Sequence, residues 1–390
     1  MKKKFVIAIF FMIIIAILLV FHFYVNKKEK EETQPIPDLI VKSIISNQKE
    51  NGLFNYEYDF EKKSFTSTDN IIHQAEISLV LLDYLEKNPN DEMVKNSLKS
   101  LLKGLSDLIK SGKYGVQISY FDKVDEENLS YDEKVLLQKQ LRAEISATSL
   151  MIASMTRFRR LYNELDFATT ESYVIETLVN VAKTLLKQED ILNALYKYPP
   201  YELWYALSVF NENNSNKEIN SLLNNLDKFF TSIENIIDNK ESLLYFIKTS
   251  LIRYKSNHSP YIAGALLRNI RYFFNNYDND YNSSILNCTD SLILMNSYES
   301  LKELDADKHK FDLINLKIKN SKKEDEKFFI KQGQEWIVLD DGKIFNSSEI
   351  KKFTGFFTSG YGNPITTIKN SSACYEIFSK NQTETKNLKN

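Results

Sequence analysis

The chain has 390 residues, and its 43% hydrophobic and 26% charged residues are typical of a globular protein. Its 50 basic and 52 acidic side chains give a net charge of −2, which argues against nucleic acid as a partner because such binding needs a basic face. Glycine and proline are scarce, at 10 and 7 residues, and this disfavours sheet-rich folds, whose many tight turns need both. We therefore expect a predominantly helical protein.

The first predicted element is a transmembrane helix over residues 5–25. Three lysines precede an apolar run from Phe5 to Val25 that only His22 interrupts, and about 20 such residues span a bilayer. The run is longer than the core of a signal peptide and ends without a small-residue cleavage site, so we expect an uncleaved anchor. A cleaved signal peptide is the alternative.

The flanks of this helix predict a single-pass protein of the inner or plasma membrane. Residues 1–4 form a short tail that is expected to stay in the cytoplasm, which places the bulk of the chain outside it. Lysines also follow the helix, so the charge difference between the two flanks is small. Residues 26–37 are charged and then contain proline, and they predict a short tether to a domain over residues 38–385.

Beyond the tether, two kinds of predicted helix alternate along the chain. One apolar stripe runs along residues 91–109, which begin with a capping Asp91, and another runs along residues 217–237. Such stripes are expected of helices on the outside of a domain. Other segments are apolar on nearly every face, as expected of buried inner helices. These inner segments are residues 70–86, 142–157, 201–210 and 260–274.

The inner segments recur at intervals of roughly 60 to 70 residues, and two of them share a short string, QAEIS at 74–78 and RAEIS at 142–146. Helical hairpins repeated at this spacing close into an α/α toroid or stack into an open solenoid. Short strand-like pieces lie between the hairpins, at residues 54–58 and 114–121. The remaining predicted elements are an irregular insertion with a small hairpin at residues 323–362 and a last short helix at residues 371–378.

Cysteine and histidine place few constraints on the chemistry. The two cysteines, Cys288 and Cys374, either form one disulfide outside the cytoplasm or remain two free thiols. None of the four histidines has zinc-ligand spacing to another histidine or to a cysteine, so no metal site is expected. The sequence contains no phosphate-binding loop or dinucleotide fingerprint, and we expect no cofactor.

Two stretches near the start of the domain carry a family resemblance. NGLFNYEYD at residues 51–59, followed by DNIIHQA at 69–75, resembles the opening of bacterial six-hairpin (α/α)6 toroid proteins, which are related to glycoside hydrolases and sugar epimerases. Residues 196–207 and 355–374 are similar to later motifs of that family, so the resemblance covers most of residues 40–380. It implies an all-α (α/α)6 toroid with short β pieces that acts on or binds a polysaccharide.

The chain departs from the family motifs at several positions. Three of the changes alter charge or proton-transfer capacity, so two alternatives stay open: an active hydrolase, lyase or epimerase, and an inactive member that binds without turnover. The departures are His73 in place of arginine, Pro200-Tyr201 in place of glycine, Lys369 or Asn370 in place of aspartate, and Ala373-Cys374 in place of Gln-His.

Acidic residues on the predicted inner helices are the candidate catalytic groups, since glycoside cleavage uses two carboxyl groups across the scissile bond. Glu76, Glu144 and Glu202 each lie in an apolar segment, where burial without a partner is costly, so a cleft is indicated. The alternative is that each glutamate pairs with an arginine or caps a helix. The family resemblance also favours Glu202. His73 is a candidate general acid or base and Asp69 a candidate cleft residue, with a wall histidine and a helix cap as the alternatives.

Aromatic residues near the predicted starts of the inner helices are candidate substrate-binding groups, because sugars present flat C–H faces that stack on aromatic rings. Ordinary core packing is the alternative. The sequence thus predicts a membrane-anchored carbohydrate-active protein that acts on or binds cell-envelope glycan through an acidic, aromatic-lined cleft. An inactive glycan-binding or scaffold toroid, or a helical solenoid that binds protein, are the competing hypotheses. The aromatic candidates are Tyr56, Tyr58, Tyr198, Tyr201 and Trp204.

Overall fold

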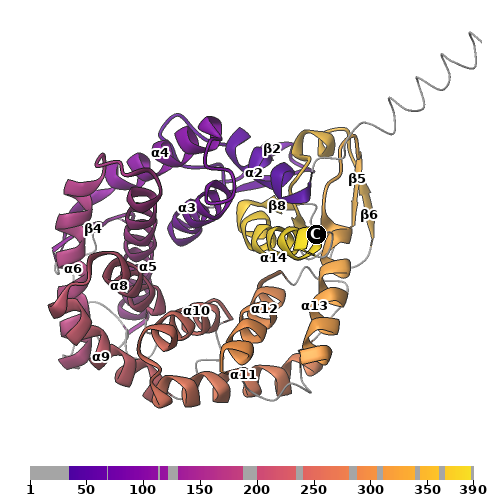
Figure 1. Ribbon diagram of the computed structural model, residues 1–390. Helices are drawn as coiled ribbons and strands as arrows, with labels where there is room; N and C mark the ends of the chain where they lie inside the picture. Colours follow the sequence, from indigo (N-terminus) through magenta and orange to yellow (C-terminus); the bar gives the residue numbers. More distant parts are fainter. Residues whose placement is uncertain are drawn as a thin grey trace, which may run out of the picture.

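The computed structural model describes residues 35–67, 69–112, 115–121, 131–187, 200–233, 240–280, 288–304, 311–338, 343–359 and 365–387. Within these residues twelve α-helices alternate between outer and inner positions and pair into six hairpins around a common centre (Figure 1). The outer helices are α2 (Ile36–Ser46), α4 (Glu92–Asp107), α6 (Ala168–Lys187), α9 (Lys217–Ser232), α11 (Pro260–Asp280) and α13 (Phe311–Asp325). The inner helices are α3 (Ile71–Leu85), α5 (Tyr131–Tyr162), α8 (Tyr201–Asn214), α10 (Lys240–Asn257), α12 (Cys288–Glu303) and α14 (Ile368–Asn387).

The inner helices form a closed ring. Each of them contacts the next inner helix along the chain, from α3 to α14, and α14 returns to contact both α3 and α2. Figure 1 shows this closure, with the first and last hairpins side by side. An open solenoid would leave its first and last repeats apart, so the closure confirms the predicted α/α toroid.

The predicted membrane anchor at residues 5–25, the tail before it and residues 26–34 of the tether lie outside the described residues. Among the residues that the structure does describe, no helix combines the length and the apolarity needed to cross a membrane. The anchor therefore stays a prediction.

Capping and burial explain where the first predicted helices begin. The side chain of Asn70 caps α3 by accepting hydrogen bonds from two backbone N–H groups, and nearly every side chain of α3 is buried. Asp91 caps α4 by accepting from the N–H of Val94 at 3.1 Å, and α4 buries one apolar stripe. The inner position predicted for residues 70–86 and the outer position predicted for residues 91–109 are confirmed.

One predicted inner helix is an outer helix in the structure. Residues 260–274, predicted as an inner helix, belong to the outer helix α11, where Tyr261 and Tyr272 are exposed and a Cβ added at Gly264 would meet nothing. In the sequence, Tyr261 and Tyr272 count as apolar residues, although their side chains face outward in the structure. The sequence predicted no inner helix over α10, the inner helix that precedes α11, because the buried serine, threonine and arginine side chains of α10 give it a polar composition.

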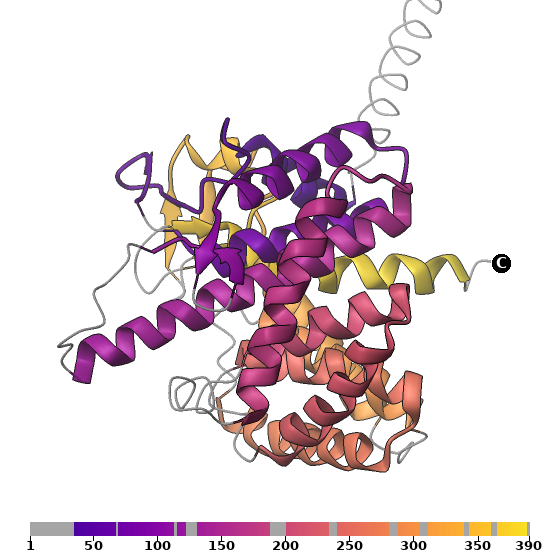
Figure 2. The ribbon, with the colours of Figure 1, turned by 90° about the vertical axis from the view of Figure 1, so that its left-hand side faces the viewer.

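Short strands gather at the end of the toroid where the inner helices begin (Figure 2). The largest sheet has the antiparallel order β2-β1-β8-β7, and it joins the first hairpin to the last because Tyr58 of β1 pairs with Thr366 of β8. The pairs β3–β4 and β5–β6 are separate antiparallel hairpins. The strands are β1 (Glu57–Asp59), β2 (Ser64–Phe65), β3 (Ile109–Gly112), β4 (Gly115–Ile118), β5 (Trp336–Val338), β6 (Ile344–Asn346), β7 (Thr358–Ser359) and β8 (Ile365–Thr367), with 3-10 helices η4 (Glu326–Phe328) and η5 (Ile350–Phe353).

The segment between α13 and α14 packs a small core of its own against β1. Gly355 has a φ of +94°, and a Cβ there would collide with the Leu39 carbonyl oxygen and the Ser43 hydroxyl, so this glycine lets the segment lie directly on α2. The helix predicted at residues 371–378 extends over the whole of α14 and completes the inner ring. The small core consists of Tyr58, Phe60, Ile330, Ile337, Ile350, Phe353 and Phe356.

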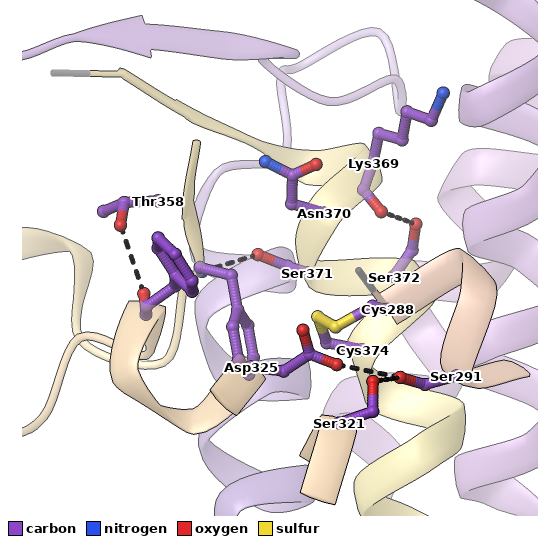
Figure 3. Close-up of a disulfide and its surroundings, with 12 residues drawn as sticks. Cys288, Ser291, Ser321, Asp325, Thr358, Lys369, Asn370, Ser371, Ser372 and Cys374 are labelled. Atoms are coloured by element: carbon purple, nitrogen blue, oxygen red, sulfur yellow. Dashed lines mark hydrogen bonds between the residues drawn. A yellow bond between two sulfur atoms is a disulfide. The ribbon is translucent and has the colours of Figure 1, made fainter. Parts of the chain in front are cut away.

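A disulfide joins the last two inner helices. Cys288, the first residue of α12, is bonded to Cys374 of α14, with 5.1 Å between their Cα atoms (Figure 3). Both side chains are buried, so the bond lies inside the ring of helices. Of the two alternatives for the cysteines, the structure has the pair. Figure 3 also shows Lys369, which lies five residues before Cys374 on the same helix.

Candidate functional site

A cavity of about 250 Å³ lies at the centre of the ring and is lined by side chains from all six inner helices. On three of these helices, charged side chains recur seven residues apart and form two tiers. Seven residues correspond to about two helical turns, or about 10 Å along the axis. The mouth tier, near the helix starts, is Glu76 of α3, Glu241 of α10 and Lys369 of α14, and the deep tier is Asp83, Lys248 and Glu376 of the same helices together with Arg157 of α5.

Polar contacts connect the opening sequence motif to the mouth tier. The hydroxyl of Tyr56 lies 2.8 Å from Nδ1 of His73, and the two rings are parallel, with centroids 5.6 Å apart. Nε2 of His73 lies 3.6 Å from Oε1 of Glu241, and the Lys369 ammonium donates to the same oxygen. The carboxylate of Glu241 is therefore held between a buried imidazole and a lysine of the last helix.

The two carboxyl groups of the mouth tier have pKa values shifted in opposite directions. Burial raises the pKa of Glu76, and the nearby charge of Glu241 raises it further, against the opposing effect of His73. Burial also acts to raise the pKa of Glu241, but the hydrogen bond with His73 and the charge of Lys369 outweigh it and hold that pKa well below its usual value. The two carboxyl groups of this one cavity therefore differ in acidity, and Glu76 keeps its proton to a higher pH than Glu241 does.

The side chain of Glu76 is oriented by a second inner helix. The hydroxyl of Tyr245, on α10, donates a hydrogen bond to Oε1 of Glu76 at 3.1 Å. Burial and the Glu76 charge raise the pKa of Tyr245 well above its usual value, so this phenol stays a hydrogen-bond donor. Of the five residues predicted as catalytic, Glu76 is the one that lines the cavity.

Glu144 and Asp69 lie beside the mouth and both bind Tyr120, shortly after the end of β4. Oε1 of Glu144 accepts a hydrogen bond from the backbone N–H of Tyr120 at 2.8 Å. The hydroxyl of Tyr120 in turn donates to Asp69 at 2.9 Å. Asp69 also accepts from the side chain of Gln74 at 2.9 Å, and the same amide group bonds the backbone of Phe54. These contacts give both carboxylates a structural role at the rim.

Glu202, which the resemblance favoured as a catalyst, is paired inside the protein. It is 1% exposed, and it does not line the cavity. Its Oε2 accepts a hydrogen bond from the hydroxyl of Ser146 at 3.0 Å, and Nη2 of Arg142 lies 3.5 Å from Oε1. The structure therefore gives Glu202 the arginine pairing that was the alternative interpretation of a buried glutamate.

The predicted sugar-stacking residues are dispersed. Tyr56 lies at the mouth through its contact with His73. Tyr58 belongs to the small core beside β1, and Tyr201 and Trp204 are buried in the main core at 1% and 0% exposure. Their rings pack against other aromatic side chains of the core. Tyr198 lies outside the described residues.

Sequence reasoning missed Glu241 and Tyr245 as site residues, and it noted Lys369 only as a departure from the family motif. Glu241 and Tyr245 lie on α10, whose polar composition hid its inner position. Glu241 and Lys369 are 128 residues apart, so no local pattern could have paired them. In the part of the chain that the structure describes, no group of three or more histidine, cysteine, aspartate or glutamate side chains is arranged to hold a metal ion.

Comparison with known proteins supports the fold assignment. No family model matches the sequence, and neither does any curated protein. An alpha-1,6-mannanase from Salegentibacter sp. HEL1_6 matches with a TM-score of 0.54 and 9% identity, over 88% of this chain and 97% of that one. A glycoside hydrolase family 76 mannosidase from Bacteroides thetaiotaomicron VPI-5482 matches with a TM-score of 0.55 and 7% identity, over 88% and 96% of the two chains. A sugar epimerase from a ruminal bacterium matches with a TM-score of 0.53 and 10% identity, over 92% and 99%.

The likeness is one of fold. The three proteins match over most of both chains, while their identities of 7% to 10% carry no residue-level correspondence. The chain has the glycosidase-like (α/α)6 toroid fold that the opening motif predicted.

Proposed function

We propose that this protein is a membrane-anchored carbohydrate-active enzyme that cleaves a glycosidic bond of cell-envelope glycan at the mouth tier. The observation that carries the proposal is the opposite pKa shift of Glu76 and Glu241, two carboxyl groups that line one cavity. Such a separation assigns one group as acid and the other as anion, which is what glycoside cleavage requires. The neighbours of the fold, described as a mannanase, a mannosidase and a sugar epimerase, support carbohydrate as the substrate class.

In this mechanism Glu76 is the general acid. Its protonated carboxyl group transfers a proton to the glycosidic oxygen as the bond between that oxygen and the anomeric carbon breaks. The ionised carboxylate of Glu241 stabilises the positive charge that develops on the sugar. A water molecule then attacks the anomeric carbon, and the proton it releases restores Glu76 to its acid form. Tyr245 orients the acid, while His73 and Lys369 hold the anion.

We also propose that residues 5–25 anchor the chain and that the toroid lies outside the cytoplasm. The long apolar run supports the anchor. The disulfide between Cys288 and Cys374 supports the location, because such bonds persist in oxidising compartments and are rare in the cytosol.

Product analysis tests the enzymatic proposal. Full-length protein in detergent is incubated with isolated envelope glycans, and the released sugars are identified by mass spectrometry. Glu76→Gln keeps the shape of the side chain but removes its proton, and we expect kcat to fall by about 100-fold or more. Glu171→Gln is the matched control, because Glu171 is also a buried, arginine-paired glutamate but lies outside the cavity. Glu76 would be rejected as the acid if both variants lost activity equally, or if Glu76→Gln kept the activity of the wild type.

A second candidate function is glycan binding without turnover. The observation that favours it is that Glu144 and Glu202 are engaged in structural contacts, which leaves Glu76 as the one predicted carboxylate in the cavity. A binder would retain glycan affinity in Glu76→Gln and release no product in the wild type. Isothermal titration with the same glycans separates this outcome from catalysis.

A further inference from the structure

The deep tier places four charged side chains from four different inner helices around the far part of the cavity. Nη2 of Arg157 lies 2.6 Å from Oδ1 of Asp83, and Nζ of Lys248 lies 2.7 Å from Oε2 of Glu376. The four side chains keep between 12% and 29% of their surface exposed. Since all four line the cavity, that exposed surface is available to a molecule inside it.

The deep tier repeats the mouth tier with its charges exchanged. On α10 the residue pair is Glu241 and then Lys248, and on α14 it is Lys369 and then Glu376. The two tiers lie about 10 Å apart. The side chains that line the cavity between them are mostly apolar, with Tyr245 and Ser372 as polar exceptions. The apolar side chains between the tiers are Leu79, Val80, Leu244 and Leu292.

The Lys248 ammonium has hydrogen-bonding capacity to spare. It carries three N–H donors, and within the described residues its hydrogen-bond acceptor is the Glu376 carboxylate, at 2.7 Å. Burial acts to lower the pKa of Lys248, but the carboxylate of Glu376 outweighs this and keeps the amine charged. Tyr205 of α8 and Asn296 of α12 line the same region. The deep tier therefore offers donors and acceptors together, and the formal charges of its four cavity-lining side chains cancel. Glu86, which lies 2.8 Å from Nη2 of Arg157, does not line the cavity.

Sugar hydroxyls match this arrangement, since each donates one hydrogen bond and accepts others. A neutral set of paired cations and carboxylates favours neither an anionic nor a cationic ligand. The volume of about 250 Å³ lies just below the range of pockets for drug-sized ligands, which suits one or two sugar units.

We infer that the deep tier is a recognition subsite for the hydroxyl groups of an uncharged terminal sugar, so that the cavity takes the end of a glycan chain. This inference rests on the proposed function, because it assigns the sugar beyond the bond that Glu76 and Glu241 would cleave. It predicts that the substrate enters end-on, with its terminal unit between Lys248 and Glu376 and the scissile bond at the mouth tier.

Binding of simple glycosides to the full-length protein tests the subsite. The probes are methyl glycosides of glucose, galactose, mannose and N-acetylglucosamine, the corresponding disaccharides, and glucuronate as a charged comparison, measured by isothermal titration. The double variant Lys248→Met/Glu376→Gln removes the ion pair without leaving a lone buried charge. We expect it to bind the preferred disaccharide at least about 10-fold more weakly than wild type.

A matched control pair lies elsewhere in the protein. Lys95 and Glu164 form an ion pair at 2.8 Å with similar exposure, 17% and 24%, but neither lines the cavity. Lys95→Met/Glu164→Gln should leave glycoside affinity unchanged. If the deep-tier double variant unfolds, the near-isosteric Tyr205→Phe provides the same test, with a several-fold loss of affinity expected.

Four outcomes separate this inference from the proposed function. Loss of both affinity and cleavage in the deep-tier variant supports both. Wild-type KM and affinity in that variant overturn the subsite while the cleavage proposal stands. Binding that depends on the deep tier, without product release, supports the subsite and overturns cleavage. Absence of binding and cleavage in the wild type, or preference for glucuronate over every neutral sugar, overturns the subsite.

Discussion

Removal of the Cys288–Cys374 disulfide is expected to destabilise the toroid strongly. The bond closes a loop across a sequence separation of 86 residues, which contains α13 and five of the seven side chains of the small core beside β1. In the chain-entropy treatment, closing such a loop lowers the conformational entropy of the unfolded chain by about 15 cal/mol/K. This stabilises the folded protein by about 4.6 kcal/mol at 25 °C. Because whole-domain stabilities are about 5 to 15 kcal/mol, this is a large share of the total.

The measurement compares oxidised protein, protein reduced with a phosphine, and the variant Cys288→Ala/Cys374→Ala. Urea unfolding followed by circular dichroism should show the free energy of unfolding lowered by about 4 to 5 kcal/mol in the reduced protein. The double alanine variant should lose slightly more, because both cysteines are buried and truncation leaves small voids. Reduced and oxidised proteins that agree within about 1 kcal/mol would refute the entropic reasoning. Two freely alkylated thiols in native protein would refute the bond itself.

Three further predictions concern charge and backbone geometry. Activity should fall as pH rises through the raised pKa of Glu76, because the acid must be protonated, and the rate measured against pH should lose this limb in Glu76→Gln. The pKa of Glu241 is lowered in the folded protein, so Glu241 stabilises the fold above the ordinary glutamate pKa of about 4.3. This stabilisation is lost as the pH falls below that value. The melting temperatures of wild type and Glu241→Gln should therefore converge in acid. Gly52→Ala should cost roughly 1 to 3 kcal/mol in urea unfolding, because Gly52 has a φ of +84° and an added Cβ would strike the Ser100 carbonyl oxygen; unchanged stability would contradict that close approach.

Local signals in the sequence predicted the parts of the fold that depend on neighbouring residues. Asn70 and Asp91 cap helices as their residue types suggest, and the apolar periodicity of the first helices gives their inner and outer positions correctly. The periodicity did not reveal α10, because this helix carries Glu241, Tyr245 and Lys248 on its cavity side and buries other polar side chains elsewhere. The polar side chains that line the cavity are among those that hide an inner helix in the sequence.

The candidate site was harder to predict because its contacts join distant parts of the chain. The sequence supplied Glu76 and His73, which lie close to the opening motif. Glu241 and Lys369 come into contact only when the ring closes, and no sequence pattern near either residue predicts this contact. Glu202 shows the opposite failure, since the motif resemblance singled it out while its environment is a buried pair with Arg142.

The closure between α14 and α2 sets the order in which this molecule can be completed. The last helix docks on a helix more than 300 residues earlier, so the ring cannot close during synthesis until the final segment has emerged. Until then the flanks of α3 and α12 present apolar surface that α14 later covers. A chain that ends before α14 would therefore expose this surface permanently, and it should be recognised by quality-control proteases even though five complete hairpins precede the break.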